Sequence, residues 1–366
     1  MAFTVVVAPD SFKGSLDARS VASAIREGWL SVRPGDEVLL HPQADGGEGT
    51  LDAVEAAIPG ARRVSAGEVL GPDGRPTPGE WLQLPDGTAV VELAQMSGLP
   101  LMGELDALGA TTRGLGQVLR AAAESGAKRI LVGLGGSAST DAGAGALAEL
   151  GLVAEGGSLI EGGAGLAGIR SLDASEMVTP PPFGVELLTD VTAPLFGPTG
   201  AAAVFGPQKG ASPAEVVELD GLLRHFAELG GGDPHYPGTG AAGGTGYGLA
   251  TFWGAGITSG ADHLAELTGL TDAIAAADLV LTGEGRFDSQ SLGGKVVGQL
   301  LQRADAAGTR VGVIAGSVDA VAEAAGEPVW TAALVGYAGS VEAAIAEPAR
   351  WLHEAGADAA RALGRD

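Results

Sequence analysis

The sequence predicts an α/β protein in which one parallel-sheet domain is built from both ends of the chain and a second α/β domain is inserted between them. Short apolar runs near both ends alternate with helical patterns, as is typical of buried parallel strands. Between them, longer strand patterns are joined by the turn sequence PDG at 72–74 and 85–87, which favours antiparallel pairing. A chain of 366 residues with 45% hydrophobic residues is long enough to bury two cores.

The first part of the chain predicts two strand–loop–helix units. TVVVA at 4–8 is an apolar β-branched run, and Ser15 is a candidate N-cap for a helix whose apolar face comprises Ala18, Val21, Ala22, Ile25 and Trp29. EVLLH at 37–41 predicts the second strand, which is followed by the loop 42–49 and a helix over 50–57. In such sheets, loops at the carboxyl ends of the strands carry function.

The remaining elements complete both domains. We expect antiparallel strands between residues 62 and 92, then helices over 112–125, 140–150 and 214–229 and strands over 130–133 and 185–189. The glycine-rich stretch 230–248 is a candidate lid or hinge. Apolar strands at 279–282, 311–315 and 330–335 bring the parallel strands of the first domain to five. The predicted domains are therefore 1–61 together with 277–366, and 62–276.

Composition and charge exclude several classes of function. The net charge of −24 repels phosphate backbones and anionic lipid surfaces, so neither a nucleic acid nor a membrane is an expected partner. The absence of cysteine excludes disulfides, thiolate nucleophiles and cysteine-ligated metals. With no basic leader and no apolar segment of about 18 residues, the sequence predicts a cytoplasmic protein, which we expect to be a monomer or a homodimer.

Familiar catalytic signatures are absent, and glycine-rich loops with charged residues remain. There is no P-loop, GxSxG, HExxH or HRD-type loop, and GTGAAG at 238–243 matches a dinucleotide fingerprint without the strand that should precede it. Only four of the 21 basic residues are lysine, and three of these adjoin glycine: Lys13, Lys209 and Lys295. Lysine supplies a point charge for a phosphate or carboxylate, and glycine allows a ligand to approach the backbone.

Three such loops belong to the first domain. DSFKGS at 10–15 leads to a predicted helix N-terminus, which favours an anion, although it can also be an ordinary capped turn. ADGGEGT at 44–50 carries Asp45 and Glu48, two carboxylates that suit Mg²⁺ or simply shape a turn. TGEGRFD at 282–288 and GGK at 293–295 form a third cluster of acids and bases.

The second domain repeats this combination. GLGGSASTD at 133–141 has the small residues that allow close backbone approach, and Asp141 is either a cap or a ligand for a hydroxyl or cation. Asp190 lies at a strand end and precedes Lys209, so an acid that takes a hydroxyl proton is paired with a lysine that neutralises an anion. These parts suit phosphoryl transfer, in which catalysis is mostly positioning and charge stabilisation, but they do not name the acceptor.

Taken together, the segments resemble the type I glycerate kinases. The resemblance rests on APDSFKGSL at 8–16, ADGGEGT at 44–50, GLGGSASTDAG at 133–143, DVTAPLFGPTGAAAVFGPQKGA at 190–211, GAAGGTGYG at 240–248 and LVLTGEGRFDSQSLGGK at 279–295. It implies a flavodoxin-like domain built from both chain ends, an inserted α/β domain and a site in the cleft between them. It also implies ATP-dependent, Mg²⁺-assisted phosphorylation of D-glycerate, which in bacterial members generally gives 2-phosphoglycerate.

The sequence departs from the family pattern at three places. Gln43 stands where methionine is frequent, Thr192-Ala193 where Asp-Asn is frequent, and residues 139–142 read Ser-Thr-Asp-Ala where Thr-Asn-Asp-Gly is common. The departure beside Asp190 is the one that bears on metal binding or substrate preference.

On this basis we assign candidate roles. Asp190 would accept the proton of the glycerate hydroxyl, Lys13 or Lys209 would neutralise the transferring phosphoryl group, and Asp45 and Glu48 would bind Mg²⁺. The candidates for binding substrate and phosphate are Asp10, Ser11, Gly46, Gly47, Gly135, Gly136, Ser137, Asp141, Glu284, Asp288 and Lys295. A glycerate 3-kinase, a kinase of a related hydroxy acid and a sensor that binds a nucleotide or sugar acid without turnover are the alternatives.

Overall fold

The computed structural model describes residues 3–289, 291–292, 296–319 and 328–364. Its contacts divide the chain into two compact units, with residues 1–45, 52–59 and 261–366 in unit 1 and residues 46–51 and 60–260 in unit 2. Residues 261–276, which the sequence analysis places in the inserted domain, thus belong to unit 1. The reason is packing, because Ala265, Leu270 and Ile274 share a hydrophobic cluster with Val6 and Val280. The domain boundaries at 61/62 and 276/277 stay predictions.

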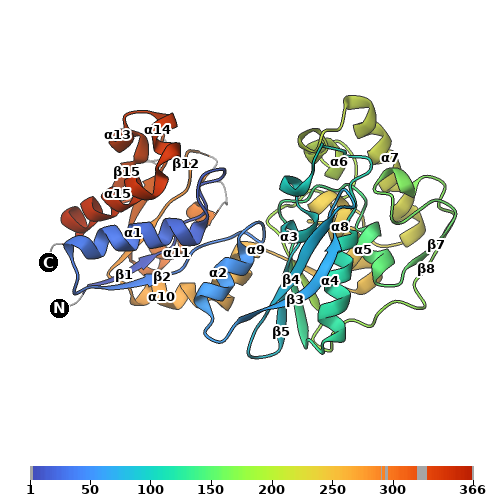
Figure 1. The fold of residues 1–366 in the computed structure, drawn as a ribbon, viewed down its shortest axis with the longest axis horizontal. Coiled ribbons are helices and arrows are strands. Elements are labelled where there is room, and N and C mark those ends of the chain that lie inside the picture. The colour runs from blue at the N-terminus through green and yellow to red at the C-terminus, as the bar shows by residue number, and fades with distance from the viewer. Residues whose placement is uncertain (1–2, 290, 293–295, 320–327, 365–366) are drawn as a thin grey trace. The chain divides into compact units, whose positions relative to one another are not determined.

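Unit 1 contains a five-stranded, wholly parallel sheet (Figure 1). The strand order is β15 (Trp330–Ala333), β13 (Arg310–Ala315), β11 (Leu279–Thr282), β1 (Thr4–Val7) and β2 (Glu37–Leu40). Counted along the chain, this is the order 2-1-3-4-5 of flavodoxin-like folds, whose switch point lies between the first and third strands. The predicted fold class is confirmed, and the five predicted parallel strands are all present.

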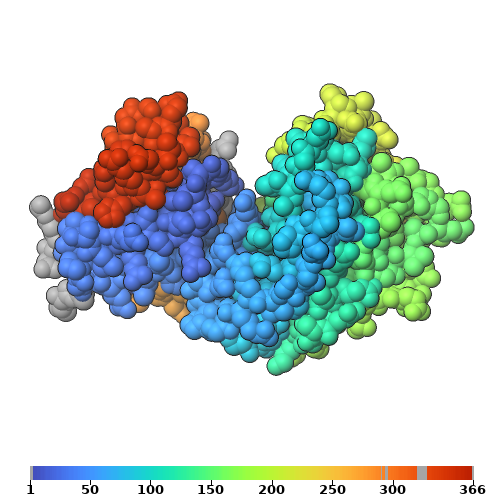
Figure 2. Space-filling view, in the orientation of Figure 1, coloured from blue at the N-terminus to red at the C-terminus, as the bar shows by residue number. Residues whose placement is uncertain are grey.

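Helices cover this sheet because their apolar faces and those of the strands exclude water together. They are α1 (Ala18–Val32), α9 (Gly260–Leu267), α10 (Leu270–Ala276), α11 (Val296–Ala307), α13 (Leu334–Ala338), α14 (Val341–Ala346) and α15 (Pro348–Leu363). Helix α2 (Thr50–Ala57) is shared between the units. Helices α1 and α15, from opposite ends of the chain, adjoin in Figure 2 as the blue and red segments of unit 1. They approach closely because Gly28 faces the backbone of His353, and Gly356 faces that of Ile25. Two short strands, β12 (Arg286–Phe287) and β14 (Ser317–Val318), pair beside the main sheet.

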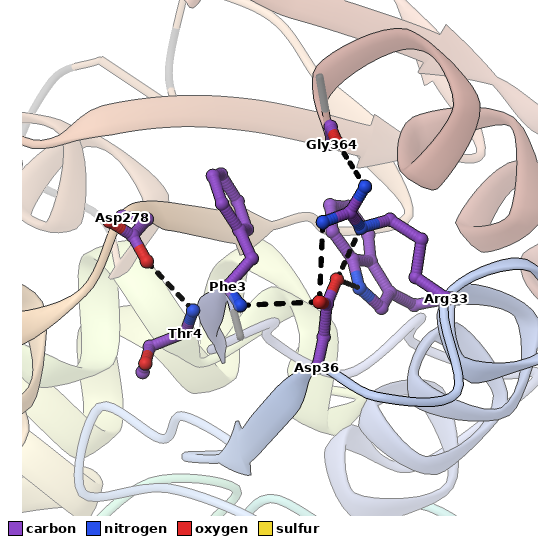
Figure 3. A network of polar contacts seen from close by, with 7 residues as sticks. Phe3, Thr4, Arg33, Asp36, Asp278 and Gly364 are labelled. Carbon is purple, nitrogen blue, oxygen red and sulfur yellow. Dashed lines mark hydrogen bonds and ion pairs between the residues drawn. The ribbon is translucent and has the colours of Figure 1, made fainter. Parts of the chain in front are cut away.

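A polar network also joins the chain ends within unit 1 (Figure 3). Asp36 accepts hydrogen bonds from Phe3 N at 3.2 Å and Trp29 Nε1 at 3.0 Å, and it forms an ion pair with Arg33. The Arg33 guanidinium also donates to the carbonyl oxygen of Gly364. Beside this network, Asp278 accepts from Thr4 N at 2.8 Å and so links β1 to the start of β11.

Unit 2 contains a six-stranded mixed sheet. Its order is β10 (Gly256–Thr258), β9 (Val185–Leu188), β6 (Arg129–Gly133), β5 (Thr88–Glu92), β4 (Pro76–Gln83) and β3 (Arg62–Leu70). As predicted from the PDG turns, β3, β4 and β5 pair antiparallel, whereas β5, β6, β9 and β10 pair parallel. A separate hairpin is formed by β7 (Val153–Glu155) and β8 (Ser171–Asp173). The longer helices of unit 2 are α4 (Arg113–Glu124), α7 (Pro213–Gly230) and α8 (Ala241–Trp253).

Shorter helical segments complete unit 2. They are α3 (Ala94–Ser97), η1 (Leu99–Leu101), α5 (Ala144–Glu149), η2 (Ala164–Leu166), α6 (Ala201–Phe205) and η3 (Pro207–Lys209). Helix α5 begins four residues after the predicted start at 140, because Gly143 adopts a left-handed conformation just before it. Among the described residues, no helix combines the length and the hydropathy needed to cross a bilayer.

The predicted lid or hinge at 230–248 is wrong for its second half. Residues 239–249 are almost entirely buried, and Tyr247 at the centre of this stretch has no exposed surface. Gly243 lies so close to the chain at 139–140 that an added Cβ would fall 2.0 Å from the Ser139 carbonyl oxygen. The glycines therefore serve core packing rather than motion.

Candidate active site

The loops at the carboxyl ends of the five parallel strands of unit 1 line one cavity of about 450 Å³. Asp10 follows β1, Asp45 follows β2, Glu284 follows β11, Gly316 follows β13 and Leu334 follows β15. The loops after β1 and β11 are joined by a hydrogen bond from Asp10 N to the Gly283 carbonyl oxygen at 2.8 Å. They flank the switch point of the strand order, where open parallel sheets bind their ligands.

The loop after β1 reaches this cavity as a tight turn. Phe12 is buried and forms a bridge with Leu16, with the Leu16 carbonyl oxygen accepting from Phe12 N at 2.8 Å. The predicted N-cap at Ser15 is wrong, because Ser15 donates to the Phe12 carbonyl oxygen and Asp17 caps α1 by accepting from Ser20 N at 2.8 Å. The α1 N-terminus is thus already capped by a carboxylate. Ser11 and the exposed Lys13 line the cavity from the turn that precedes it.

The charge of Asp45 lies close enough to Asp10 to affect the ionisation of Asp10. The pKa of Asp10 is raised to about 6. Burial is the main cause and the neighbouring charge of Asp45 adds to the rise, while the hydrogen bond from Ser11 N at 2.6 Å and the charge of Lys13 oppose it. Two carboxylates supply oxygen ligands of the kind that Mg²⁺ takes together with phosphate oxygens and water, and Lys13 lies in the same cavity. These side chains therefore fit a magnesium ion bound with a nucleotide.

The loop after β11 supplies the other charged wall of the cavity. Glu284, Arg286 and Asp288 all line it, and Arg286 Nε lies 3.2 Å from Asp288 Oδ2. Asp288 N donates a hydrogen bond to Ser291 Oγ at 3.0 Å, which fixes the conformation of this loop. Lys295, predicted to belong to the same cluster, lies outside the described residues.

The glycines predicted to cradle phosphate pack against one another in unit 2. Gly135 donates its N–H to the Gly46 carbonyl oxygen at 3.0 Å, and an added Cβ on Gly135 would lie 2.3 Å from the Gly47 Cα. At Gly135 the backbone therefore lies close to the backbone of Gly46 and Gly47. Gly136 is exposed at the tip of its loop and has a φ of +77°. Steric fit between segments explains the three packed glycines.

Glu92 is a buried carboxylate that the sequence analysis did not single out. It has no exposed surface, and it accepts from Gly49 N at 3.1 Å and from Leu51 N at 3.0 Å. It therefore holds the segment that carries Glu48, whose own side chain is exposed. The available signal was a glutamate ending the otherwise apolar strand TAVVE, because a charge on a buried strand needs partners.

Asp141 is fully buried and acts as a structural acceptor. Its carboxylate receives hydrogen bonds from Thr112 N at 3.0 Å, Thr112 Oγ1 at 2.8 Å, Gly143 N at 3.0 Å and Gly145 N at 3.2 Å. Burial raises its pKa, and these four donors oppose the rise. Of the two roles considered for Asp141, the geometry favours the cap. The next residue, Ala142, has a φ of +55°, which suits the glycine common there in the family.

Lys209 is likewise buried, with 2% of its surface exposed. Its Nζ donates to the Ser139 carbonyl oxygen at 2.5 Å and lies 3.5 Å from Ser137 Oγ. Burial lowers the pKa of Lys209 to about 8, although the charge of Asp141 opposes this. Lys209 thus stabilises the 133–141 loop through its contacts with Ser139 and Ser137. This placement favours a positioning role over direct contact with a phosphoryl group.

Asp190 follows β9 and is exposed. Its Oδ1 accepts from Ser259 Oγ at 2.9 Å and from Gly260 N at 3.0 Å. These two donors orient the carboxylate, and an oriented, accessible carboxylate is suited to accept a proton from a bound hydroxyl. Ser259 is a second residue that sequence reasoning missed, because it lies far from Asp190 in the chain.

The predicted site residues therefore form two groups. Unit 1 brings together Asp10, Ser11, Lys13, Asp45, Glu284 and Asp288 in one cavity. Unit 2 holds Glu48, Asp190, Lys209 and the loop residues Gly135, Gly136, Ser137 and Asp141. Asp45 and Glu48, predicted as a metal-binding pair, belong to different units, and no cluster of three or more acidic or histidine side chains that could hold a metal occurs among the described residues.

Comparisons with known proteins agree with this architecture. A model of the Glycerate kinase family matches residues 5–364. Glycerate 2-kinase of Escherichia coli (strain K12) is 43% identical over 304 residues, which span 80% of this chain and 79% of that protein. Glycerate kinase of Bacillus subtilis (strain 168) is 40% identical over 326 residues, which span 86% and 85% of the two chains.

A solved structure shows the same fold. A crystal structure assigned as glycerate kinase 2 from Salmonella typhimurium LT2 has a TM-score of 0.81 and 34% sequence identity, and the match covers 100% of this chain and 99% of that one. Since the family match, the relatives and the structural likeness each extend over most or all of the chain, the protein belongs to the glycerate kinase family.

Proposed function

We propose that this protein transfers the γ-phosphoryl group of ATP to the 2-hydroxyl of D-glycerate and so forms 2-phosphoglycerate and ADP. The observation that carries the proposal is membership of the glycerate kinase family over residues 5–364, with a relative named glycerate 2-kinase at 43% identity. A cytoplasmic location is part of the proposal, because ATP is made and held there. The acids at the strand ends, together with Lys13 in the loop after β1, support phosphoryl transfer.

In the proposed reaction, Asp190 accepts the proton of the glycerate 2-hydroxyl. The hydroxyl oxygen forms a bond to the γ-phosphorus as the bond between that phosphorus and the β–γ bridging oxygen breaks, and ADP leaves. Ser259 and Gly260 orient Asp190 through its Oδ1. Lys13 is proposed to neutralise the negative charge of the γ-phosphoryl group during transfer, because it is exposed and lines the unit 1 cavity.

A magnesium ion bound with ATP would neutralise phosphate charge. Asp45, with Asp10 beside it, is the proposed protein ligand, because these carboxylates line the same cavity as Lys13. Buried Lys209 is proposed to shape the 133–141 loop through the Ser139 carbonyl oxygen. The charged groups that act on ATP are thus assigned to unit 1, and the proton acceptor to unit 2.

The proposal is tested by following product through enolase, pyruvate kinase and lactate dehydrogenase, first without and then with phosphoglycerate mutase. Without mutase, NADH oxidation that depends on D-glycerate and ATP is the expected result, because enolase accepts only the 2-phosphate. A signal that requires mutase would contradict the choice of hydroxyl and indicate the 3-phosphate. No signal in either assay, together with ATP binding, would favour another hydroxy acid or a sensor.

The metal requirement needs a direct assay, because enolase and pyruvate kinase themselves require Mg²⁺. Phosphorus NMR of D-glycerate and ATP with the protein reports product without coupling enzymes. Turnover that disappears with excess chelator and returns with added Mg²⁺ is the expected outcome. Turnover unaffected by chelator would contradict the assignment of Asp45.

A further inference from the structure

The lining of the unit 1 cavity combines two kinds of side chain. Lys13, Arg286 and four carboxylates are charged. The apolar wall comes mostly from the C-terminal segment, with Leu334 at the start of α13, Ala344 and Ile345 in α14 and Pro348 at the start of α15. Ile345 is 57% exposed, which leaves a large apolar side chain facing solvent at the cavity.

Size and polarity identify which substrate such a cavity fits. Glycerate is a three-carbon acid with an oxygen on every carbon, and an apolar wall would strip its water without supplying hydrogen bonds. Cavities of about 300–1,000 Å³ with apolar linings and a few polar groups hold ligands of drug size. The volume of about 450 Å³ lies in that range and exceeds what glycerate needs. A nucleotide matches both kinds of lining, because it has a flat base with apolar faces and a charged phosphate chain.

We propose that the apolar wall formed by Leu334, Ala344, Ile345 and Pro348 binds the base of the nucleotide, with the phosphates directed toward Lys13. This inference rests on the proposed function and extends it by assigning the nucleotide to unit 1. The wall contacts the base faces and removes apolar surface from water, which favours binding in proportion to the buried area. The carboxylates that line the same cavity would then meet the phosphates through the bound cation.

The other large cavity fits a nucleotide less well. It measures about 670 Å³ and lies in unit 2. Among the described residues that line it there is no lysine, and Arg113 is held by Glu149 with an N–O distance of 2.7 Å. Asp73, Glu104 and Asp106 add negative charge. A triphosphate at this place would face carboxylates without a lysine such as Lys13, which lines the unit 1 cavity.

Helix α14 offers a matched pair of variants. Ile345 lines the cavity, whereas Val341 on the same helix is similarly exposed, at 54%, and does not line it. Ile345→Asn should weaken binding of Mg-ATP about tenfold, the loss expected when much of one apolar side chain's contact is removed. Val341→Asn should leave binding unchanged, and Ile345→Met, which stays apolar, should restore most of the affinity. Circular dichroism and thermal melting check that all three variants fold.

Calorimetry on the full chain without glycerate provides the main readout, with Mg-ATP and Mg-tripolyphosphate as probes. Ile345→Asn should weaken ATP but leave tripolyphosphate unchanged, because the latter has no base. Equal weakening of both probes, or no weakening of ATP, would overturn the inference.

Steady-state kinetics separate this inference from the proposed function. The expected pattern for Ile345→Asn is a higher KM for ATP with kcat and the KM for glycerate nearly unchanged. A raised KM for glycerate alone would place glycerate in this cavity and overturn the inference while leaving the glycerate kinase activity intact. Binding of ATP that follows the expected pattern in a protein without glycerate turnover would overturn the proposed function and leave the inference standing.

Discussion

Lys209 is a buried residue whose pKa differs between the folded and the unfolded chain. In the unfolded chain its pKa is near the ordinary value of 10.5, and burial lowers it to about 8 in the folded protein. Between these values the unfolded chain binds a proton that the folded protein does not, so folding becomes more favourable as pH rises. The buried ammonium therefore costs stability at neutral pH.

Replacement of this lysine should reveal that cost. The free energy of unfolding of the wild type, relative to Lys209→Met, should rise by on the order of 3 kcal/mol between pH 8 and 10.5. Urea denaturation at a series of pH values measures it. Lys128→Met, which removes an exposed lysine, is the control for loss of one positive charge. Parallel pH profiles for the wild type and Lys209→Met would show that the lysine is not desolvated.

Asp190 is the residue on which the proposed chemistry depends most. Asp190→Asn keeps the Oδ1 acceptor for Ser259 and Gly260 but removes the ability to take a proton. Turnover should fall by about 10²–10⁴-fold, as for the loss of a general base, while the melting temperature stays close to that of the wild type.

The matched variant for this test is Ser259→Ala, which only removes one orienting donor. It should reduce kcat much less than Asp190→Asn does. Full activity of Asp190→Asn would assign the base elsewhere, and Asp45, Asp141 and Asp288 are the next candidates, although the burial of Asp141 makes it the weakest of these.

At the scale of elements, helices α1 and α15 can cross closely because Gly28 and Gly356 have no side chains at the contact. A Cβ added to Gly28 would lie 2.0 Å from the His353 carbonyl oxygen, so Gly28→Ala must push the helices apart. We expect a loss of about 1–3 kcal/mol in the free energy of unfolding. Gly221→Ala is the matched control, because Gly221 lies within α7 and its added Cβ meets nothing within 4 Å.

The two variants should change stability in opposite directions. Gly221→Ala should stabilise the protein by about 0.5–1 kcal/mol, since alanine loses less backbone entropy in a helix than glycine does. Chemical denaturation monitored by circular dichroism measures both. Equal effects of the two substitutions would mean that helix propensity, and not the close crossing, determines the result.

At the scale of the whole molecule, the two chain ends are joined within unit 1. Asp36 connects β1, α1 and, through Arg33, the C-terminal Gly364 (Figure 3). Burial alone would raise the pKa of Asp36, but hydrogen bonds from Arg33, Trp29 and Phe3 lower it below the usual range. A carboxylate with a lowered folded pKa stabilises the protein above its unfolded pKa, and this stabilisation is lost as pH falls through the folded pKa.

Asp36→Asn should therefore destabilise the protein at pH 7 and have little effect in strong acid. We expect about 1–3 kcal/mol at neutral pH, the range for hydrogen bonds to a charged group. Asp305→Asn, at an exposed position in α11, is the control for the charge change. A destabilisation that stays constant from neutral pH to acid would indicate lost packing and contradict the electrostatic explanation.

Much of the candidate site could be predicted because strand ends are marked locally in the sequence. Asp10, Asp45 and Glu284 each follow an apolar run by a few residues, and parallel strands bring such positions to one edge of a sheet. Glu92 and Ser259 were missed because their partners, Gly49 and Asp190, lie far away along the chain. No local pattern identifies such partners, although the glutamate that ends the buried strand TAVVE indicates that Glu92 needs them.

The sequence by itself determined the parallel sheet built from both chain ends, the antiparallel strands between them and the loops that carry charge. These follow from alternation, apolar runs and turn residues, which act over a few neighbouring positions. Only the tertiary structure decided that Gly135 packs on Gly47, that Lys209 and Asp141 are buried, and that Asp17 rather than Ser15 caps α1. Burial and hydrogen-bond partners depend on which distant segments meet, and that is a property of the folded chain.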